Sequence, residues 1–285
     1  MEIKRLTPAA RRVFRRKIYD HFSHHGRAFS WRKTRDPYHI FVSEVMLQQT
    51  QAERVENKFP VFITAFPDID TLASAPMADV LTVWQGMGYN RRALFLQKAA
   101  CQIRDEYGGK IPSTVEQLER LSGIGPATAR SIAAYAFNCP VPFIETNIRT
   151  VFIHCFFPGR TGVSDREIYP LVEQTLDRDN PWKWYNALMD YGVMLKEKHG
   201  NPGRHSAHYK KQSSFRNSDR RVRGGIIRFL TEKAALNEGK FIREALFEKD
   251  RVVRSLQSLV KDGMIIKIGN KYFLPGNEKK ACGKK

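Results

Sequence analysis

Apolar residues recur at helical spacing through most of the chain. From residue 6 to about residue 210 they return every three or four positions, and the breaks between these segments hold Gly, Pro, Asp or Ser. This periodicity is typical of amphipathic helices and predicts a mainly α-helical fold. Asp36 and Pro37 predict the start of one helix, running to about residue 59, because aspartate accepts an orphan N–H and proline needs none.

A second pattern follows a basic stretch at residues 197–223, where large apolar residues almost disappear. The later periodicity predicts three helices, which cover residues 223–232, 240–247 and 251–262. The run at residues 264–274 alternates around Gly269-Asn270, which predicts a hairpin with a type I′ turn. Three helices followed by a hairpin suggest a winged helix, and the polar tail at 276–285 is expected to be disordered.

Charge narrows the choice of partners. Lysine and arginine number 48 against 29 acidic residues, which gives a formal net charge of +19. Such an excess predicts a polyanionic partner, with nucleic acid first and an acidic membrane surface as the rival. The sequence has no long apolar run, no basic amphipathic helix with aromatic anchors and no signal-peptide core. We therefore expect a soluble, cytoplasmic, nucleoid-associated protein of bacterial type with no membrane contact.

The cysteines give no sign of a metal site. They stand far apart, without a C-x-x-C pair or a cysteine–histidine cluster at zinc spacing, at Cys101, Cys139, Cys155 and Cys282. Buried or incidental thiols of a reducing compartment are the expectation.

The strongest local motif covers residues 118–129. Leu121 and Ile124 can pack between two helices, while the backbone at Gly123 and Gly125 comes close to a partner. Exposed N–H groups at a helix N-terminus suit a phosphate oxygen, although an ordinary glycine turn would have the same residues. The pattern resembles the DNA-gripping hairpin of the helix-hairpin-helix glycosylase superfamily, which implies that Ala127 and Thr128 also face phosphate. A monovalent cation at the hairpin is a further candidate.

A second motif lies in residues 43–51. If the predicted helix continues, Glu44, Gln48 and Gln51 share one face, which places a carboxyl group beside two amides that can meet base edges. Neighbouring apolar side chains would desolvate Glu44, raise its pKa and equip it as a general acid. The alternative is a solvated helix face.

Together with the hairpin, this segment resembles the catalytic helix of MutY adenine glycosylases, and the resemblance covers about residues 15–195. It implies two helical subdomains with the active site in the cleft between them. The expected division is a six-helix-barrel subdomain at 30–135, a second helical subdomain at 1–29 and 136–212, a linker at 213–220 and a winged-helix-like domain at 221–275. That last domain resembles the short tail of some bacterial members rather than the Nudix-like domain of longer ones.

The resemblance also assigns roles to matching positions. Glu44 corresponds to the acid that protonates the flipped adenine at N7. The positions that line the base pocket in the family are Trp31, Arg32, Leu47, Ala127 and Asp190. The positions that contact the mispair or enter the base stack are Gln48, Gln49, Met87 and Tyr89. A packing role is the alternative for each aromatic residue.

Two catalytic positions depart from relatives. The family's Asp-Gly-Asn reads Glu145-Thr146-Asn147 here. The resemblance implies that Glu145 and Asn147 stabilise the sugar cation, but the glutamate arm is longer by one methylene, and an error of about 1 Å can be costly in rate. A plain helix-start charge is the alternative. Ala127 stands where bifunctional relatives place a lysine nucleophile, which implies a monofunctional glycosylase.

The iron–sulfur ligands of the family are also replaced. In register, the four cysteine positions are occupied by Lys196, Gly203, Ser206 and Gln212. None of these can bind iron as a thiolate does, so no cluster or other metal is expected. The basic loop at 196–212 is predicted to contact phosphates while being held by packing, with a plain solvated linker as the alternative.

These inferences favour a base excision repair enzyme acting as a monomer on duplex DNA that contains a mispair. The preferred reaction is hydrolytic removal of adenine opposite 8-oxoguanine or guanine. Two alternatives stay open: a mismatch-specific thymine or uracil glycosylase of the same superfamily, and a protein that binds mispairs without catalysis.

Overall fold

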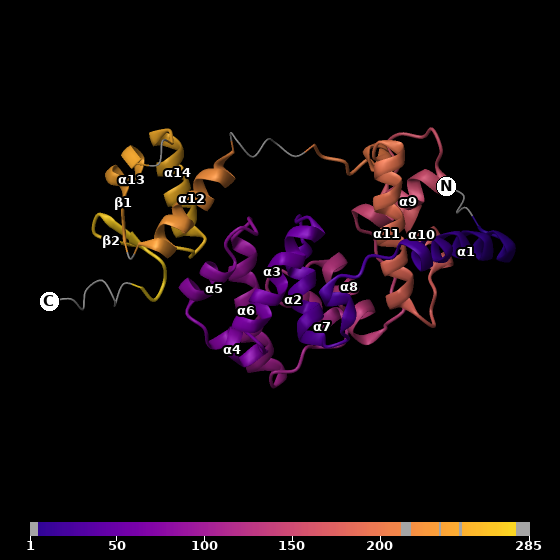
Figure 1. The fold of residues 1–285 in the computed structure, drawn as a ribbon, viewed down its shortest axis with the longest axis horizontal. Coiled ribbons are helices and arrows are strands. Elements are labelled where there is room, and N and C mark those ends of the chain that lie inside the picture. Colours follow the sequence, from indigo (N-terminus) through magenta and orange to yellow (C-terminus); the bar gives the residue numbers. More distant parts are fainter. Residues whose placement is uncertain (1–4, 212–217, 234, 245–246, 278–285) are drawn as a thin grey trace. The chain divides into compact units, whose positions relative to one another are not determined.

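The computed structural model of the protein describes residues 5–211, 218–233, 235–244 and 247–277. Helices form most of the regular structure (Figure 1), which confirms the mainly α-helical expectation. The chain divides into two compact units. The first unit comprises Met1–Glu44, Ser113–Glu119 and Ile124–Lys211, and the second comprises Val45–Pro112, Arg120–Gly123 and Gln212–Lys285.

The first unit is built around a buried central helix, α9 (Thr146–Phe156), which packs against α11 (Pro181–His199) and α10 (Asp165–Thr175) (Figure 1). Ile148, Val151 and Phe152 follow at helical spacing on α9 and are fully buried in its core. The elements of this unit are α1 (Pro8–His25), η1 (Ser30–Lys33), the first part of α2 (Pro37–Leu47), α7 (Val115–Glu119), α8 (Pro126–Phe137), α9 (Thr146–Phe156), α10 (Asp165–Thr175), α11 (Pro181–His199) and η2 (Pro202–His205).

The second unit combines short helices with a small sheet. Its helices are α3 (Ala52–Ala65), α4 (Ile69–Ser74), α5 (Met77–Val83), α6 (Arg91–Tyr107), α12 (Asp219–Glu232), α13 (Glu238–Glu244) and α14 (Lys249–Lys261). Its strands are β1 (Leu236–Asn237), β2 (Ile266–Ile268) and β3 (Lys271–Phe273). Helix α6 packs on α4, and α12 packs on both α14 and α5.

Helix α2 starts where the sequence predicts but ends early. The Asp36 carboxylate accepts a hydrogen bond from the N–H of His39 at 2.9 Å, as expected of an N-cap. The helix then ends at Leu47 instead of reaching residue 59, and Gln49 takes a left-handed φ of 55°. The prediction that Glu44, Gln48 and Gln51 share a helix face is therefore wrong.

A buried arginine accounts for this early end. In a continuing helix the carbonyls of Val45 and Met46 would accept N–H groups from the next turn. Here both accept from the Arg92 guanidinium of α6, at 3.0 and 2.7 Å, and the Val45 carbonyl also accepts from the N–H of Gln48 at 3.3 Å. The same guanidinium donates to Thr50 Oγ1 at 2.8 Å, so one side chain caps α2 and holds the turn that follows.

The winged-helix expectation is confirmed, with one addition. Three helices precede a β2–β3 hairpin, and β1, which the sequence pattern did not predict, pairs antiparallel with β3. Leu236 of β1 is fully buried, but a two-residue strand is too short to show alternation. Gly269 has φ 59°, whereas Asn270 is not among the residues with positive φ. The expected type I′ turn, which needs positive φ at both positions, is therefore not formed.

The predicted domain boundaries stay predictions. Of the predicted linker, residues 213–217 lie outside the described residues, and so do residues 278–285 of the predicted tail and Cys282. The thiols of Cys101, Cys139 and Cys155 are free and partly buried. In the described parts of the chain, no helix is both long and apolar enough to cross a membrane.

Candidate active site

Glu44 lies on α2 with an environment that favours its protonated form. Burial raises the pKa of its carboxyl group to about 7, the hydrogen bond from Ser131 lowers it, and the negative charge of Glu145 raises it again. A carboxyl group that holds its proton near neutral pH can act as a general acid. The raised pKa has the cause expected from the sequence, which is desolvation of Glu44.

Ser131 is a site residue that the sequence did not reveal. It lies on α8, and its hydroxyl is 2.6 Å from Oε2 of Glu44 and 2.9 Å from the carbonyl oxygen of Thr128. A hydroxyl group can donate one proton and also accept. Ser131 can therefore donate to the ionised Glu44 carboxylate, or accept from the protonated carboxyl group while donating to Thr128. No sequence signal distinguishes this serine from others in a small-residue helix.

Glu145 forms the N-cap of α9. Its Oε1 accepts hydrogen bonds from the backbone N–H groups of Asn147, at 2.5 Å, and of Ile148, at 2.8 Å. Burial is the largest influence and raises the pKa of Glu145, while these bonds and the charge of Lys196 oppose the rise. The net result is a raised pKa of Glu145. A helix N-terminus alone would lower that pKa, because its partial positive charge favours the ionised carboxylate.

Two cations lie near this carboxylate. Lys196 of α11 donates to Oδ1 of Asn147 at 2.6 Å, and burial lowers the pKa of its ammonium group while Glu145 raises it. Arg149 forms a bidentate pair with Asp165, with both N–O distances 2.7 Å. The predicted catalytic residues Glu44, Glu145 and Asn147 thus lie in the first unit within one electrostatic network.

Arg32 and Asp190, two predicted pocket residues, are paired with each other. Asp190 is buried, and its carboxylate accepts from both terminal nitrogens of Arg32, at 2.8 and 3.0 Å, and from Arg27. Burial alone would raise the pKa of Asp190, but the bonds and charges of the two arginines hold it below its ordinary value. Trp31, also buried, stacks on Phe29 with ring centroids 4.6 Å apart. Asp190 therefore orients Arg32 as an ion pair.

The predicted mispair residues lie in the second unit. Gln48 follows α2 and donates from Nε2 to the carbonyl oxygen of Gly123 at 3.2 Å, and exposed Gln49 is held in the left-handed conformation. Tyr89 accepts a hydrogen bond from Arg220 of α12 at 2.6 Å and has Arg92 over its ring. Leu47 is half-buried at the end of α2.

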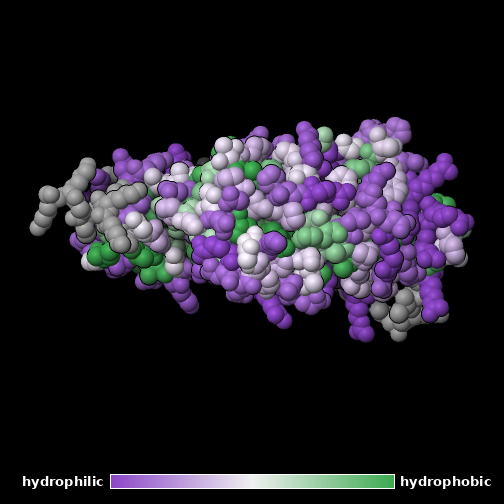
Figure 2. Space-filling model, turned by 90° about the horizontal axis from the view of Figure 1, so that it is seen from below, coloured by the Kyte–Doolittle hydropathy of each residue, from purple (hydrophilic) through white to green (hydrophobic). Residues whose placement is uncertain are grey.

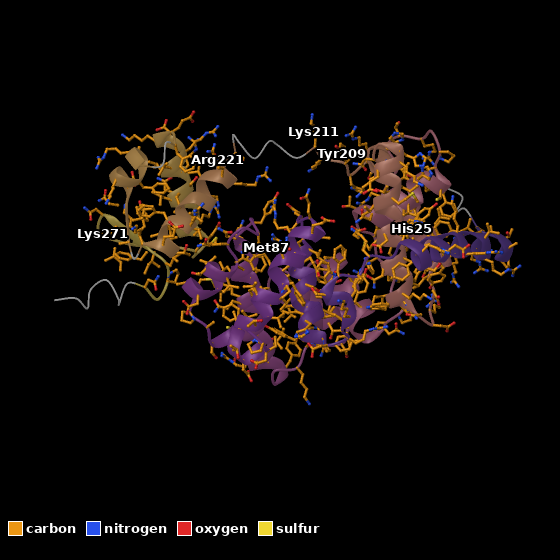
Figure 3. All side chains as sticks on the ribbon, in the orientation of Figure 1. His25, Met87, Tyr209, Lys211, Arg221 and Lys271 are labelled. Carbon is orange, nitrogen blue, oxygen red and sulfur yellow. The ribbon has the colours of Figure 1, made fainter. Side chains whose placement is uncertain are left out.

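Met87 differs from the expectation for a stacking residue. Its side chain, labelled in Figure 3, is only 1% exposed in the core of the second unit. A residue that enters the base stack must reach the surface. The assignment of Met87 to that role therefore conflicts with this structure, whereas Tyr89 is partly exposed.

The hairpin motif has the packing that the sequence predicts. Leu121 and Ile124 are buried, while Gly123 and Gly125 are exposed. Gly123 has φ 78°, and a Cβ there would lie 2.6 Å from Cβ of Phe95, so the position requires glycine on both counts. Gly125 is the N-cap of α8, where no side chain caps the helix, and Ala127 in the first turn is exposed. The backbone at this helix N-terminus suits an anion. The cation at the hairpin and the phosphate contact of Thr128 stay predictions.

The residues at the family's cluster positions do not fit an iron–sulfur group. Lys196 is engaged with Asn147, and a Cβ at Gly203 would lie 2.7 Å from Thr150 Oγ1. Ser206 offers only a hydroxyl group, and position 212 lies outside the described residues. Within the described ranges, no cluster of three or more His, Cys, Asp or Glu side chains could hold a metal ion.

Backbone hydrogen bonds and packing hold the basic loop at residues 196–211 in place. Val163 donates to the carbonyl of His205 at 3.0 Å and accepts from the N–H of Ala207 at 2.9 Å. Gly203 lies against α9. The loop remains basic, and Tyr209 and Lys211, labelled in Figure 3, are exposed. Hydrophilic residues also cover most of the face visible in Figure 2.

Comparison with known proteins shows similarity to base excision DNA repair proteins. Residues 42–175 match the family model described as HhH-GPD superfamily base excision DNA repair protein. An adenine DNA glycosylase of Buchnera aphidicola (subsp. Baizongia pistaciae) is 32% identical over 188 residues, which are 64% of this chain and 53% of that protein. The protein of that name in Mycolicibacterium smegmatis is 28% identical over 275 residues, which are 90% and 94% of the two chains. The chain thus spans about half of the first relative and nearly all of the second.

Solved structures show the same fold. A thermostable thymine-DNA glycosylase superposes with a TM-score of 0.61 at 23% identity, over 67% of this chain and 90% of the other. An endonuclease III in a non-covalent DNA complex superposes with a TM-score of 0.54 at 18% identity, over 79% of this chain and 99% of the other. The expected helix-hairpin-helix glycosylase fold is confirmed, residues 42–175 match the HhH-GPD superfamily model, and the curated relatives to which the chain is similar are named adenine DNA glycosylases.

Proposed function

We propose that this protein is a monofunctional DNA N-glycosylase that removes adenine paired with 8-oxoguanine or guanine. The observation that carries the proposal is the pair of carboxyl groups in the first unit, in which burial raises the pKa of Glu44 to about 7 and Glu145 caps the start of α9. The superfamily match and the names of the relatives support it. The net charge of +19 and the names of the relatives support DNA as the partner.

The reaction requires the base to leave the stack, because the bond to be broken is inaccessible inside a duplex. Glu44 transfers its proton to N7 of the flipped adenine, the C1′–N9 bond breaks, and its electron pair goes to the base. Glu145 stabilises the cation that forms on the sugar, with Asn147 beside it. A water oxygen then bonds to C1′ and gives its proton to the Glu44 carboxylate. Ala127 has no amine, so this position forms no Schiff base.

The remaining predicted residues would hold the duplex around this centre. The hairpin backbone at Gly123 and Gly125 would bind phosphate, and the basic loop that includes Lys211 would add charge contacts. Gln48, Gln49 and Tyr89 would face the mispair. For Tyr89 to enter the stack, its hydrogen bond to Arg220 must break, so DNA binding would release that contact.

Adenine is favoured over a pyrimidine because of Glu44. A general acid with a pKa of about 7 matches a base whose ring nitrogen N7 accepts the proton, and thymine and uracil have no N7. The likeness to a thymine-DNA glycosylase, at 23% identity, concerns the fold alone. Glu145, by its longer arm, is the position at which the pocket departs from the pattern of the resembling family.

Single-turnover base release from a panel of duplexes tests the proposal. The panel contains adenine opposite 8-oxoguanine and guanine, thymine and uracil opposite guanine, and matched controls. We expect adenine release by the wild type, and none by Glu44→Gln, which should still bind the duplex. Preferred release of thymine or uracil would overturn the choice of base, and no release by folded wild-type protein would leave mispair binding as the function.

A further inference from the structure

Helix α11 contacts Asn147 at three positions on one face. Met189 Sδ lies 3.9 Å from Asn147 Nδ2, and Lys196 Nζ lies 2.6 Å from Oδ1. Between them, Gly192 lets the helix approach so closely that a Cβ there would be 2.6 Å from the Asn147 carbonyl oxygen. The spacings of three and four residues match the helix repeat, so one face of α11 forms a continuous packing surface for this asparagine.

Lys196 determines which way the Asn147 amide faces. An ammonium group is only a donor, so the atom that meets it must be the amide oxygen. The NH₂ end then points to the other side, where Nδ2 lies 3.5 Å from Oε2 of Glu145. A rotated amide would place an NH₂ group against an ammonium ion, which is unfavourable.

We propose that Lys196 is a positioning residue, which holds the Asn147 amide with its NH₂ group toward Glu145 and thereby fixes the carboxylate at the reaction centre. Glu145 already receives two backbone N–H groups on Oε1. The oriented amide constrains Oε2, so both oxygens of the carboxylate are placed. A glutamate side chain has one more rotatable bond than that of aspartate. The second constraint is therefore needed to keep the carboxylate in one position.

The charge of Lys196 acts in the same direction. Burial raises the pKa of Glu145, and the nearby ammonium group opposes that rise and keeps more of the carboxylate ionised. Arg149, the other cation near Glu145, is held in its bidentate pair with Asp165. The charged and titratable groups that interact with Glu145 therefore include Glu44, Lys196, Arg149 and the buried Tyr135.

The consequence for catalysis rests on the proposed function and can be measured by base release. Lys196→Met keeps the length of the stem and removes the charge. We expect its single-turnover rate to fall by about tenfold or more, as for other displaced catalytic groups, with the affinity for a non-cleavable duplex changed no more than in the control. The matched control is Lys198→Met, which removes an exposed charge from the same end of α11. Lys196→Arg, which can still donate to Oδ1, should recover part of the rate.

The pH profile separates positioning from general damage. Glu145 must be ionised, so the rate rises with pH on the acid side of the profile. In Lys196→Met this acid limb should move to higher pH, because the charge that held the pKa of Glu145 down is gone. Equal rates and equal profiles for Lys196→Met and Lys198→Met would overturn the proposal.

A measurement without catalysis distinguishes the failure of this inference from failure of the proposed function. In ¹⁵N-labelled protein the Asn147 side-chain NH₂ signals should lie away from random-coil positions and exchange slowly with solvent in the wild type and in Lys198→Met, and should move toward random-coil positions and exchange faster in Lys196→Met. If wild-type protein released no base but this pattern held, the proposed function would be wrong and the positioning by Lys196 right. Unchanged signals in a folded Lys196→Met protein would exclude the positioning.

Discussion

The hydroxyl of Ser131 lies 2.6 Å from Oε2 of Glu44, and the bond joins residues 87 positions apart. It connects α8, which begins at the hairpin, to the carboxyl group proposed as the general acid. The serine hydroxyl can bond to either form of the carboxyl group, but it favours the ionised form and so lowers the pKa of Glu44. Burial and the charge of Glu145 raise the pKa of Glu44, while the Ser131 hydrogen bond and the charge of Arg32 lower it.

The first prediction concerns pH. Base release requires protonated Glu44, so the wild-type rate should fall as pH rises through about 7. Ser131 stabilises the ionised form, and Ser131→Ala should raise the pKa of Glu44 and move the alkaline limb of the rate profile to higher pH. Single-turnover rates across pH measure this, with the exposed Ser23→Ala as control. An unmoved limb would show that Ser131 does not influence the acid.

The second prediction concerns the length of the Glu145 arm. The cap of α9 and the contact with Asn147 are built on a glutamate, so Glu145→Asp should withdraw the carboxylate from the amide and lower the rate about tenfold. Glu145→Gln, which keeps the length and removes the charge, should lose more. Single-turnover adenine release compares them. A faster aspartate variant would show that the longer glutamate side chain lowers the rate, and that the site is not built for a glutamate.

The third prediction concerns stability. Arg92 is buried and donates to carbonyls in α2 and in the loop after α5. Arg92→Met leaves those acceptors without a donor and should lower the free energy of unfolding by about 3 kcal/mol. Arg91→Met is the matched control, because that side chain is 57% exposed and pairs with Asp262 at 3.4 Å. Its loss should stay under about 1 kcal/mol in the same urea titration. Similar losses in both variants would contradict the capping role.

The fourth prediction compares two helical glycines. A Cβ at Gly192 would lie 2.6 Å from the Asn147 carbonyl oxygen, whereas at Gly224 no atom lies within 4 Å. Gly192→Ala should therefore lower both the melting temperature and the rate of base release. Gly224→Ala should leave the rate unchanged and raise stability by up to about 1 kcal/mol, since alanine favours a helix. Thermal melts and single-turnover rates measure these two effects. A fully active, stable Gly192→Ala protein would refute the close packing of α11 against Asn147.

The fifth prediction follows from the net charge of +19. Phosphate contacts release counterions, so the affinity for duplex DNA should fall steeply between about 50 and 200 mM salt. Fluorescence anisotropy with a labelled mispaired duplex measures the slope. A flat response would mean that the basic surface is not the DNA footprint.

The sequence by itself determined the features that depend on near neighbours in the chain. Helical periodicity, the Asp36 cap of α2 and the glycine hairpin each act within a few residues, so their signals are local. The desolvated Glu44 and the helix-start position of Glu145 could be inferred for the same reason. The resemblance to a known family supplied the chemical roles.

The tertiary structure alone decided the rest. Helix α2 ends where Arg92, 46 positions beyond Met46, donates to the Met46 carbonyl, and no local propensity encodes that bond. Lys196 reaches Asn147 across 49 positions in the same way. Met87 shows the opposite case, since the family resemblance implied a residue that enters the base stack, whereas packing buries it. Long-range hydrogen bonds and burial depend on which surfaces meet after folding, so the pattern along the chain could not supply them.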